Sequence, residues 1–330
     1  MMQHRARTIQ VTNPGGPEVM TLVEVDLPNP KPHEVLIEQT AIGINFIDTY
    51  HRSGLYPIAL PSGIGLEAVG RVLEVGAEVD HFSPGDRIAT FLGPIGAYAD
   101  KRCIPADALI ALPDDLDDEA VAASLVKGCT AEFLLLRCFP VQPGDWVLFH
   151  AAAGGVGSIA GPWLKALGAR SIGTVGSEAK KEQAARSGYD HVLVTDRNFT
   201  SLAQSVRNIT SGEGVAVVFD GVGASSFQAS LDCLTPRGTL VSFGNASGAV
   251  TGVDLSLLAQ KGSLYVTRPT LLHYYLNTKE RDLGLARLFE QMRKSVVAPQ
   301  VHHRWPLDQA VDAHRALEER QTTGSCLLIP

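Results

Sequence analysis

The pattern of hydrophobic and polar positions changes its character at about residue 146. Up to about residue 120, short stretches alternate apolar and polar residues between turns such as Asn13-Pro14-Gly15-Gly16 and Ser83-Pro84-Gly85-Asp86. Alternation of this kind is typical of half-buried strands separated by tight turns. We expect strands at 8–11, 35–40, 70–75, 87–89 and 98–102. The first part of the chain is therefore predicted to be a β-rich domain of barrel or sandwich type.

From Trp146 onwards, short apolar runs alternate with amphipathic segments. This alternation predicts an α/β domain with a doubly wound parallel sheet, in which ligands bind at the carboxyl ends of the strands. Glycine recurs at those ends, where backbone lies close to a ligand, although strand ends and helix caps alone would also explain each glycine. The strands are predicted at 146–150, 171–175, 191–195, 215–219, 239–243 and 263–267, and the helices at 155–167, 178–187, 198–210 and 225–234.

A mainly apolar helix at 120–136 is predicted to join the two domains. The acidic cluster Asp114–Glu119 precedes it, and negative charge is favoured at a helix start, so we interpret these carboxylates as helix-entry residues and not as a metal site. Helices at 282–296 and 307–320 precede a last strand at 325–329, which we expect to return to the first domain. The predicted domains are 1–126, with 270–330 returning to it, and 127–269.

The amino-acid composition limits the kinds of partner and the cellular compartment that we expect for this protein. The net charge is −7 and the longest basic cluster is Lys180-Lys181, which argues against a nucleic acid as the main partner. No apolar run approaches the roughly 20 residues of a membrane span, and the first residues lack the apolar core of a secretory signal. The five cysteines are scattered without a C-x-x-C pair, as expected in the reducing cytoplasm.

A glycine loop follows the first predicted strand of the α/β domain. Ala152, Gly154 and Gly157 have the spacing of G-x-G-x-x-G, with alanine in the first place. Such a loop brings backbone close to a pyrophosphate and aims the N–H groups of the next helix at it. The strand before and the helix after support a dinucleotide site.

The next strand end indicates which dinucleotide. NAD-binding units carry an Asp or Glu there to hold the ribose hydroxyls, but 171–175 ends in Gly176-Ser177, with Lys180 and Lys181 close behind. A neutral tip followed by cations suits a ribose 2′-phosphate, so we expect NADP(H). A solvated helix face is the alternative explanation of the two lysines.

Over essentially all 330 residues the chain resembles the quinone oxidoreductase (zeta-crystallin-like) branch of the medium-chain dehydrogenase/reductase superfamily. The family signature matches Gly144-Asp145, Leu148, Ala152-Ala153, Gly154-Gly155-x-Gly157 and Lys165. It departs at Pro162, where glutamine is usual and where a proline removes a helical hydrogen bond. The resemblance implies a GroES-like domain, a Rossmann domain, NADPH and a homodimer. Further matching stretches are 41–50, 52–56, 241–253, 262–269 and 324–330.

Zinc-dependent members of the superfamily differ at two motifs. Their catalytic zinc uses the Cys of G-x-C-x-x-D and the His of Gly-His-Glu, where this chain has Asn45 and Leu66. The four-cysteine structural lobe is also absent from the sequence. A catalytic zinc needs three protein ligands, so we expect no metal and no Lewis acid for alcohol dehydrogenation.

The resemblance also implies roles for individual residues. It places Asn45 near the nicotinamide, with Asp48, Tyr50 and Tyr56 in the same pocket, although ordinary loop packing is an alternative for Asp48 and Tyr56. Lys180 and Arg320 match the cations around the 2′-phosphate, although a helix C-terminal charge that complements the dipole is the alternative for Arg320. Thr195 stands where relatives stack a tyrosine on the adenine. The implied cofactor contacts are Asn45, Thr130, Phe133, Gly154, Gly155, Val156, Gly157, Gly176, Ser177, Lys180, Thr195, Gly221, Phe243, Val266, Arg268 and Arg320.

The activity implied is zinc-independent reduction of quinones by NADPH. A quinone needs little acid catalysis, so orientation and exclusion of water suffice, in keeping with a sequence that shows no acid/base dyad. One alternative is NADPH-dependent reduction of α,β-unsaturated carbonyls in the same kind of pocket. Another is a non-catalytic NADPH-binding redox sensor.

Overall fold

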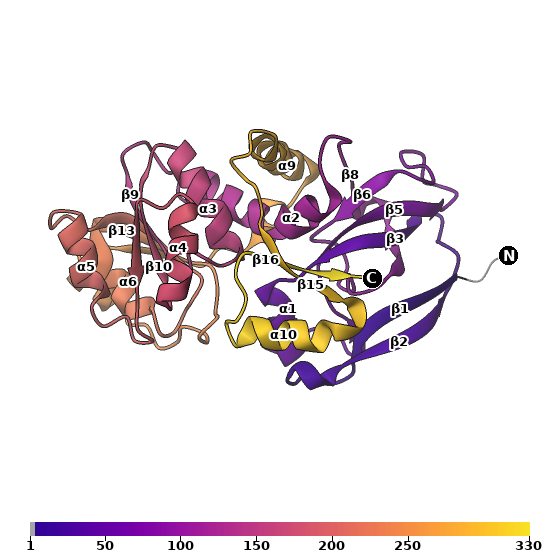
Figure 1. Ribbon diagram of the computed structural model, residues 1–330, viewed down its shortest axis with the longest axis horizontal. Helices are drawn as coiled ribbons and strands as arrows, with labels where there is room; N and C mark the ends of the chain where they lie inside the picture. The colour runs from indigo at the N-terminus through magenta and orange to yellow at the C-terminus, as the bar shows by residue number, and fades with distance from the viewer. Residues whose placement is uncertain (1–3) are drawn as a thin grey trace. The chain divides into compact units, whose positions relative to one another are not determined.

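The computed structural model describes residues 4–330. The chain forms two compact units (Figure 1). The first unit consists of the residues up to Lys127 together with Pro299–Pro330, and the second is the continuous segment Gly128–Ala298. Each unit has one of the two folds that the hydrophobic pattern predicts.

The second unit is built on a six-stranded sheet whose neighbouring strands are all parallel. The strand order β11-β10-β9-β12-β13-β14 is the 3-2-1-4-5-6 order of doubly wound dinucleotide-binding folds. All six strands predicted from the sequence are present. They are β9 (Trp146–Phe149), β10 (Arg170–Val175), β11 (His191–Val194), β12 (Val215–Asp220), β13 (Leu234–Ser242) and β14 (Tyr265–Thr267).

Helices cover both faces of this sheet, with α3 and α4 on one side and α5 and α6 on the other (Figure 1). Helix α3 (Gly155–Ala166) continues through Pro162 without a break. The neighbouring Gly161 explains how it packs, because a Cβ there would lie 2.3 Å from the Ser187 carbonyl oxygen. The other helices here are α4 (Glu178–Arg186), α5 (Leu202–Ile209), α6 (Phe227–Cys233), α7 (Ser256–Gln260) and α8 (Leu271–Tyr274).

The segment 270–298 lies in the second unit, whereas the sequence assigned it to the first domain. Contacts between elements distant in sequence decide its place. Leu288 of α9 (Thr278–Arg293) packs over Gly128, where a Cβ would lie 2.5 Å from its Cδ1 atom. The Tyr275 hydroxyl and the Arg287 guanidinium donate to the buried Glu132 at 3.0 and 2.9 Å. These contacts hold α9 against the second half of α2 (Asp118–Phe133) and its π-helical extension Leu134–Cys138.

The first unit contains a seven-stranded and a three-stranded sheet. Strand β16 (Ser325–Ile329) pairs antiparallel with β3 (Glu34–Gly43), so the last strand belongs to a sheet of the first unit. The remaining strands are β1 (His4–Val11), β2 (Met20–Leu27), β4 (Ser62–Gly63), β5 (Glu67–Val75), β6 (Arg87–Thr90), β7 (Lys101–Pro105), β8 (Leu109–Ala111) and β15 (Val301–Pro306).

Some elements of the first unit differ from the sequence-based expectation. Strand β7 begins at Lys101, three residues later than expected, because Tyr98 is fully buried in the loop before it. The strands β2 and β15 were not predicted; β2 is half-exposed and β15 lies at a sheet edge. The eight-residue helix α1 (Phe46–Ser53) was also not predicted, and α10 (Ala310–Glu318) is shorter than the predicted 307–320.

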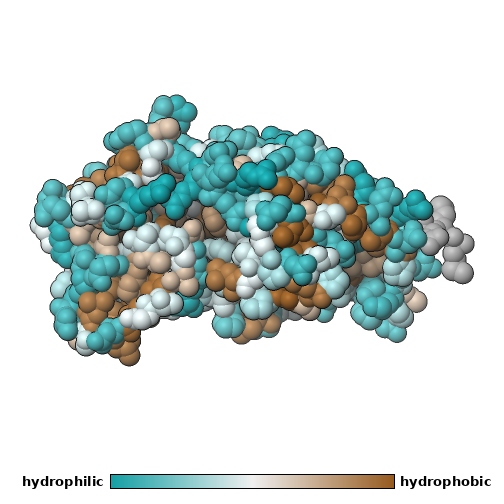
Figure 2. Space-filling view, turned by 90° about the horizontal axis from the view of Figure 1, so that it is seen from below, coloured by the Kyte–Doolittle hydropathy of each residue, from teal (hydrophilic) through white to brown (hydrophobic). Residues whose placement is uncertain are grey.

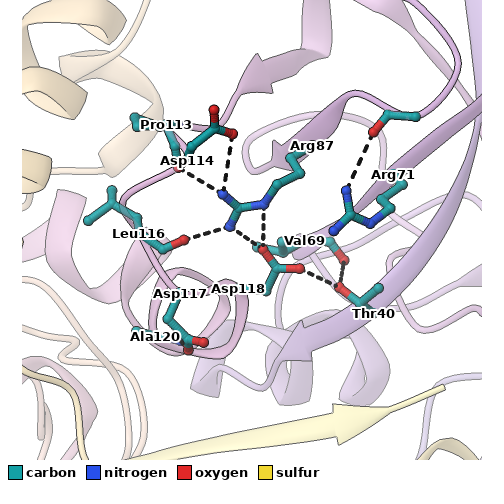
Figure 3. A network of polar contacts seen from close by, with 11 residues as sticks. Thr40, Val69, Arg71, Arg87, Pro113, Asp114, Leu116, Asp117, Asp118 and Ala120 are labelled. Atoms are coloured by element: carbon teal, nitrogen blue, oxygen red, sulfur yellow. Dashed lines mark hydrogen bonds and ion pairs between the residues drawn. The ribbon is translucent and has the colours of Figure 1, made fainter.

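The acidic segment at 114–119 is the entry to α2, as its sequence predicts (Figure 3). The Arg87 guanidinium donates to the Pro113 carbonyl at 2.9 Å and to Asp118 Oδ1 from Nε at 3.1 Å. The Asp117 carboxylate accepts from the Ala120 N–H at 2.9 Å, so it satisfies one of the unpaired donors at the helix start.

The face in Figure 2 is mostly hydrophilic, with separate hydrophobic patches. Within residues 4–330, no helix has both the length and the apolar character needed to cross a bilayer.

Candidate functional site

The glycine loop lies at the carboxyl end of β9 and leads directly into α3. Gly154 is the N-cap of α3, and no side chain caps this helix start. A Cβ at Gly157 would lie 2.4 Å from the Ala151 carbonyl oxygen and 2.8 Å from the Ala152 Cα atom. Only glycine allows the helix to approach the strand end this closely. The backbone N–H groups at the start of α3 are thus available to a phosphate, and the loop fits a dinucleotide.

The same edge of the sheet is held by a buried polar network that sequence reasoning missed. His150 follows β9, and its ring bonds the Thr174 hydroxyl at 2.8 Å and the Ser230 hydroxyl at 2.9 Å. Ser230 donates onward to Asp220 at 2.9 Å. Burial lowers the pKa of His150, with the Asp220 charge opposing. The network joins β9, β10, β12 and α6 beneath the loops of the carboxyl edge.

At the end of β10, Gly176 faces open space, with no atom within 4 Å of an added Cβ. Ser177 is the N-cap of α4, and Lys180 and Lys181 lie in its first turns. Lys181 forms an exposed ion pair with Glu178 at 3.7 Å. On the neighbouring strand, the backbone N–H of Thr195 donates to the Val175 carbonyl at 2.9 Å.

The ends of β12 and β13 approach each other through glycine. A Cβ at Gly244 would lie 2.4 Å from the Gly221 carbonyl oxygen, and one at Gly221 would lie 3.0 Å from the Phe243 ring. Arg268 donates from Nη1 to the carbonyls of Ser242 at 2.8 Å and Gly244 at 3.0 Å. These contacts place Gly221, Phe243 and Arg268 at the carboxyl edge that also carries the glycine loop.

Three further sequence-predicted cofactor residues lie away from the glycine loop. Thr130 and Phe133 are on α2, where the Phe133 ring stacks on Tyr274 with centroids 4.5 Å apart. Val266 lies on β14, the last strand in the sheet order, and its side chain is exposed.

The first unit contains a buried polar cluster around Asn45, the N-cap of α1. The Asn45 side-chain amide donates to Glu67 Oε1 at 2.7 Å, and the Lys127 ammonium lies 3.1 Å from the same oxygen. The second oxygen, Oε2, accepts from the Val126 N–H at 2.6 Å. The carboxylate is thereby matched by one cation and two neutral donors.

Asp48, at the third position of α1, is fully buried. Its Oδ2 atom accepts from the Asn45 backbone N–H at 2.8 Å and from the Tyr98 hydroxyl at 2.9 Å. Burial raises the pKa of Asp48 to about 7, although these two hydrogen bonds oppose the rise. Asp48 is therefore enclosed in the interior of the first unit and contacts Asn45 through the Asn45 backbone N–H.

The remaining predicted residues of the first unit occupy other positions. Tyr50 and Tyr56 are half-buried and pack edge to face, with ring centroids 5.2 Å apart. The Tyr56 N–H donates to the Tyr50 carbonyl at 3.1 Å. Arg320 follows the end of α10 with a φ of 60°, and its N–H donates to the Leu317 carbonyl at 3.1 Å.

The donor set around Asn45 does not fit a metal ion. The carboxylate of Glu67 already carries the Lys127 ammonium, and the amide of Asn45 uses its N–H on the same group. Within residues 4–330, no three His, Cys, Asp or Glu side chains converge as a metal site.

Comparisons with known proteins agree with this geometry. Residues 31–114 match the alcohol dehydrogenase GroES-like domain, and residues 155–283 match the zinc-binding dehydrogenase family. A quinone oxidoreductase of Pseudomonas aeruginosa is 46% identical over 98% of this chain and 100% of its own length. A 2-haloacrylate reductase of a Burkholderia species is 43% identical over 96% of each chain.

Solved structures show the same likeness in three dimensions. The structure of the Escherichia coli quinone oxidoreductase complexed with NADPH matches with a TM-score of 0.94 at 46% identity, over 98% of this chain and 100% of that one. A 2-haloacrylate reductase structure matches with a TM-score of 0.84 at 42% identity, over 98% of this chain and 99% of that one.

Proposed function

Because the chain belongs to the quinone oxidoreductase family of the medium-chain dehydrogenase/reductase superfamily, we propose that it is an NADPH-dependent quinone reductase. The observation that carries the proposal is the glycine loop at the carboxyl edge of the 3-2-1-4-5-6 sheet, where only glycine fits at position 157. A relative of 46% identity was crystallised with NADPH. The cofactor of this protein is accordingly NADPH.

In this proposal the second unit binds the cofactor. The N–H groups of Gly155, Val156 and Gly157 at the start of α3 hold the pyrophosphate, whereas the Gly154 N–H donates to the Ala151 carbonyl at 2.8 Å. Ser177 and Lys180 bind the 2′-phosphate, while Thr195 lies at the adenosine end. The open space at Gly176 supports this placement. Thr130, Phe133, Gly221, Phe243, Val266 and Arg268 complete the contacts.

The first unit supplies the groups for the acceptor. When bound, NADPH supplies a hydride, and the quinone takes up that hydride and one proton. Asn45 orients the nicotinamide, and its own orientation is set by Glu67 through the 2.7 Å bond. Tyr50 and Tyr56 present an aromatic pair suited to a flat ring. No metal step is required, because a quinone stabilises its own reduced oxygens. The contribution of the protein is orientation and exclusion of water.

Reduction of an α,β-unsaturated carbonyl is the second candidate. The observation that favours it is the 2-haloacrylate reductase at 43% identity over 96% of this chain. The same residues serve both reactions, since each reaction delivers a hydride to a flat, electron-poor conjugated carbonyl system.

The test is oxidation of NADPH followed by absorbance, with 1,4-benzoquinone, a naphthoquinone, 2-hexenal and 2-chloroacrylate as acceptors and NADH as the comparison cofactor. We expect fast turnover with the quinones and NADPH, and slow turnover with NADH. Turnover restricted to hexenal or chloroacrylate would replace the quinone assignment by the second candidate. Binding of NADPH without turnover would favour a redox sensor.

We further propose a homodimer, in which a second copy of the chain covers β14. This strand ends the sheet order and carries Tyr265 at 63% exposure. Leu255 at 75% and Leu276 at 70% are further large apolar side chains of the same unit in water, and exposed apolar surface of this kind marks interaction sites. Sedimentation equilibrium of the wild type and of Tyr265→Asp tests the dimer, with a monomeric variant expected.

We place the protein in the cytoplasm, in keeping with its five free cysteines.

A further inference from the structure

A string of four hydrogen-bonded side chains runs through the first unit and ends on Asp48. The Arg52 Nη1 atom lies 3.2 Å from His314 Nδ1. His314 Nε2 lies 3.0 Å from the Tyr98 hydroxyl, which lies 2.9 Å from Asp48 Oδ2. Arg52, His314, Tyr98 and Asp48 are each buried, with at most 2% exposure. The string therefore lies out of contact with solvent along its length.

The chemistry of the end groups fixes the direction of every hydrogen bond. A guanidinium only donates, so Arg52 makes His314 Nδ1 an acceptor. Burial, with the Arg52 charge adding to it, lowers the pKa of His314 to about 3, so the ring is neutral and its one N–H is on Nε2. That N–H must then donate to Tyr98, and the Tyr98 hydroxyl hydrogen is left to donate to Asp48.

The start of the string is firmly anchored. Arg52 donates to both oxygens of Glu318, at 3.0 and 2.6 Å, and from Nε to the Gly15 carbonyl at 3.1 Å. A bidentate arrangement of this kind holds the planar guanidinium in one orientation. The orientation of the guanidinium is thus set by α10 and by the loop after β1, and the tautomer of His314 follows from it.

We propose that Arg52 and His314 are positioning residues for the reductase reaction, because they keep the Tyr98 hydroxyl aimed at Asp48 and thereby hold Asn45 in place. The inference rests on the proposed function, which puts Asn45 beside the nicotinamide. Asp48 Oδ2 accepts the Asn45 N–H at 2.8 Å, and Asn45 then reaches Glu67. Without Arg52, the two ring nitrogens of His314 are free to exchange their roles, and the Tyr98 hydroxyl turns from Asp48 to His314.

The surroundings of Asp48 show why its ionised form depends on the Tyr98 hydroxyl. The charged and titratable groups that face the carboxyl group and its tyrosine are Tyr98, His314 from α10, Glu67 from β5, Lys127 from α2 and Cys326 from β16. Burial raises the pKa of Asp48, Glu67 raises it further, and Lys127 and the two hydrogen bonds lower it. The Oδ1 atom is buried without a hydrogen-bond partner. The ionised form therefore depends on the two donors at Oδ2.

The experiment combines activity with a direct titration of Asp48. Arg52→Met, Tyr98→Phe and His314→Leu break the string, whereas His314→Gln keeps one acceptor and one donor in the ring position. Arg87→Met is the matched control, because Arg87 is also a multiply bonded arginine of the first unit. Each variant is measured for kcat/KM with 1,4-benzoquinone from pH 5.5 to 8.5, for NADPH affinity, and for the ¹³C shift of the Asp48 carboxyl carbon.

For the wild type we expect kcat/KM to rise as Asp48 ionises near pH 7. Loss of a hydrogen bond to the carboxylate moves this inflection upwards by about one pH unit, which lowers the ionised fraction of Asp48 and hence kcat/KM at pH 7 by about fivefold. The affinity for NADPH stays unchanged in these variants. His314→Gln and Arg87→Met are expected to keep the wild-type profile.

Two results overturn the inference. One is a Tyr98→Phe or Arg52→Met profile that superimposes on the wild type; the other is an equal loss of activity in Arg87→Met, which would show a general effect on folding. The ¹³C titration separates this inference from the proposed function. If the wild type reduces no quinone but the Asp48 titration still shifts in the variants, the string is real and the reductase assignment is wrong.

Discussion

The side-chain amide of Asn45 donates to Oε1 of Glu67 at 2.7 Å, and this oxygen also lies 3.1 Å from the Lys127 ammonium. The Lys127 ammonium neutralises the buried carboxylate of Glu67, and the hydrogen bond to this carboxylate fixes the orientation of the Asn45 amide.

Breaking this pair is expected to destabilise the first unit. Within residues 4–330, Glu67 is the only carboxylate that forms an ion pair with Lys127. Glu67→Gln therefore leaves the buried ammonium without its counter-ion. Loss of one partner of a buried pair costs about 3–5 kcal/mol in the free energy of unfolding. Urea unfolding followed by circular dichroism measures this.

The matched control is Glu119→Gln, which breaks the exposed pair between Glu119 and Arg304. An exposed pair contributes only about 0–1 kcal/mol. If both variants lose the same stability, the Lys127–Glu67 pair is not the determining contact.

Gly157→Ala is expected to weaken NADPH binding by at least about tenfold. The added methyl group would lie 2.4 Å from the Ala151 carbonyl oxygen, so the start of α3 has to move away from β9. Titration calorimetry gives the dissociation constant. Ser205→Ala on α5 serves as the control, since α5 packs on the same sheet away from the loop; undiminished affinity in Gly157→Ala would contradict the site.

Lys180→Ala is expected to reduce the preference for NADPH over NADH by roughly ten- to a hundredfold, the range for losing one charge-assisted hydrogen bond. Lys181→Ala is the internal control, because Lys181 is on the same helix and pairs with Glu178 at 3.7 Å. The measurement is kcat/KM for both cofactors. Equal effects of the two substitutions would show that only the net charge of α4 matters.

Because His314 is neutral in the folded protein, the free energy of unfolding depends on pH. Its pKa is about 3 in the folded protein and about 6.5 in an unfolded chain. A lowered pKa of a histidine gives stability that is complete above pH 6.5 and is lost as the pH falls towards 3. Between pH 6.5 and 4 this loss amounts to about 3 kcal/mol.

The raised pKa of Asp48 acts in the opposite direction over much of the same range. The contribution of Asp48 to the free energy of unfolding is fully present below pH 4 and is lost as the pH rises through 7. His314→Gln removes only the first effect. We therefore expect the variant to become more stable relative to the wild type as the pH falls from 6.5 to 4, measured by urea midpoints. A constant difference across this range would mean that His314 is not buried as a neutral ring.

Local signals were sufficient for the sheet of the second unit but not for the first unit. The runs at 146–149 and 171–175, with glycine after each, predict both the strands and the ligand edge of the sheet, because the information lies within a few residues. The string from Arg52 to Asp48 has no such signal. Tyr98 and His314 are 216 residues apart in sequence, and nothing local marks either as a partner.

The location of the segment 270–298 shows the same limit. The helical pattern of α9 is readable in the sequence, but its attachment depends on Leu288 meeting Gly128 and on Tyr275 meeting Glu132. Helix α1 has only eight residues, too few for a clear periodicity. The sequence predicts what each segment becomes, whereas the neighbour of each segment is decided by tertiary contacts.

The pairing of β16 with β3 also determines the order in which a nascent chain can mature. Strand β3 is synthesised early, but the positions opposite Ile42 and Gly43 stay vacant until residues 327 and 328 emerge. By then the whole of Gly128–Ala298 has left the ribosome and can fold as a continuous unit. The first unit therefore keeps an open strand edge, the kind of edge that pairs with other chains, until β16 is synthesised.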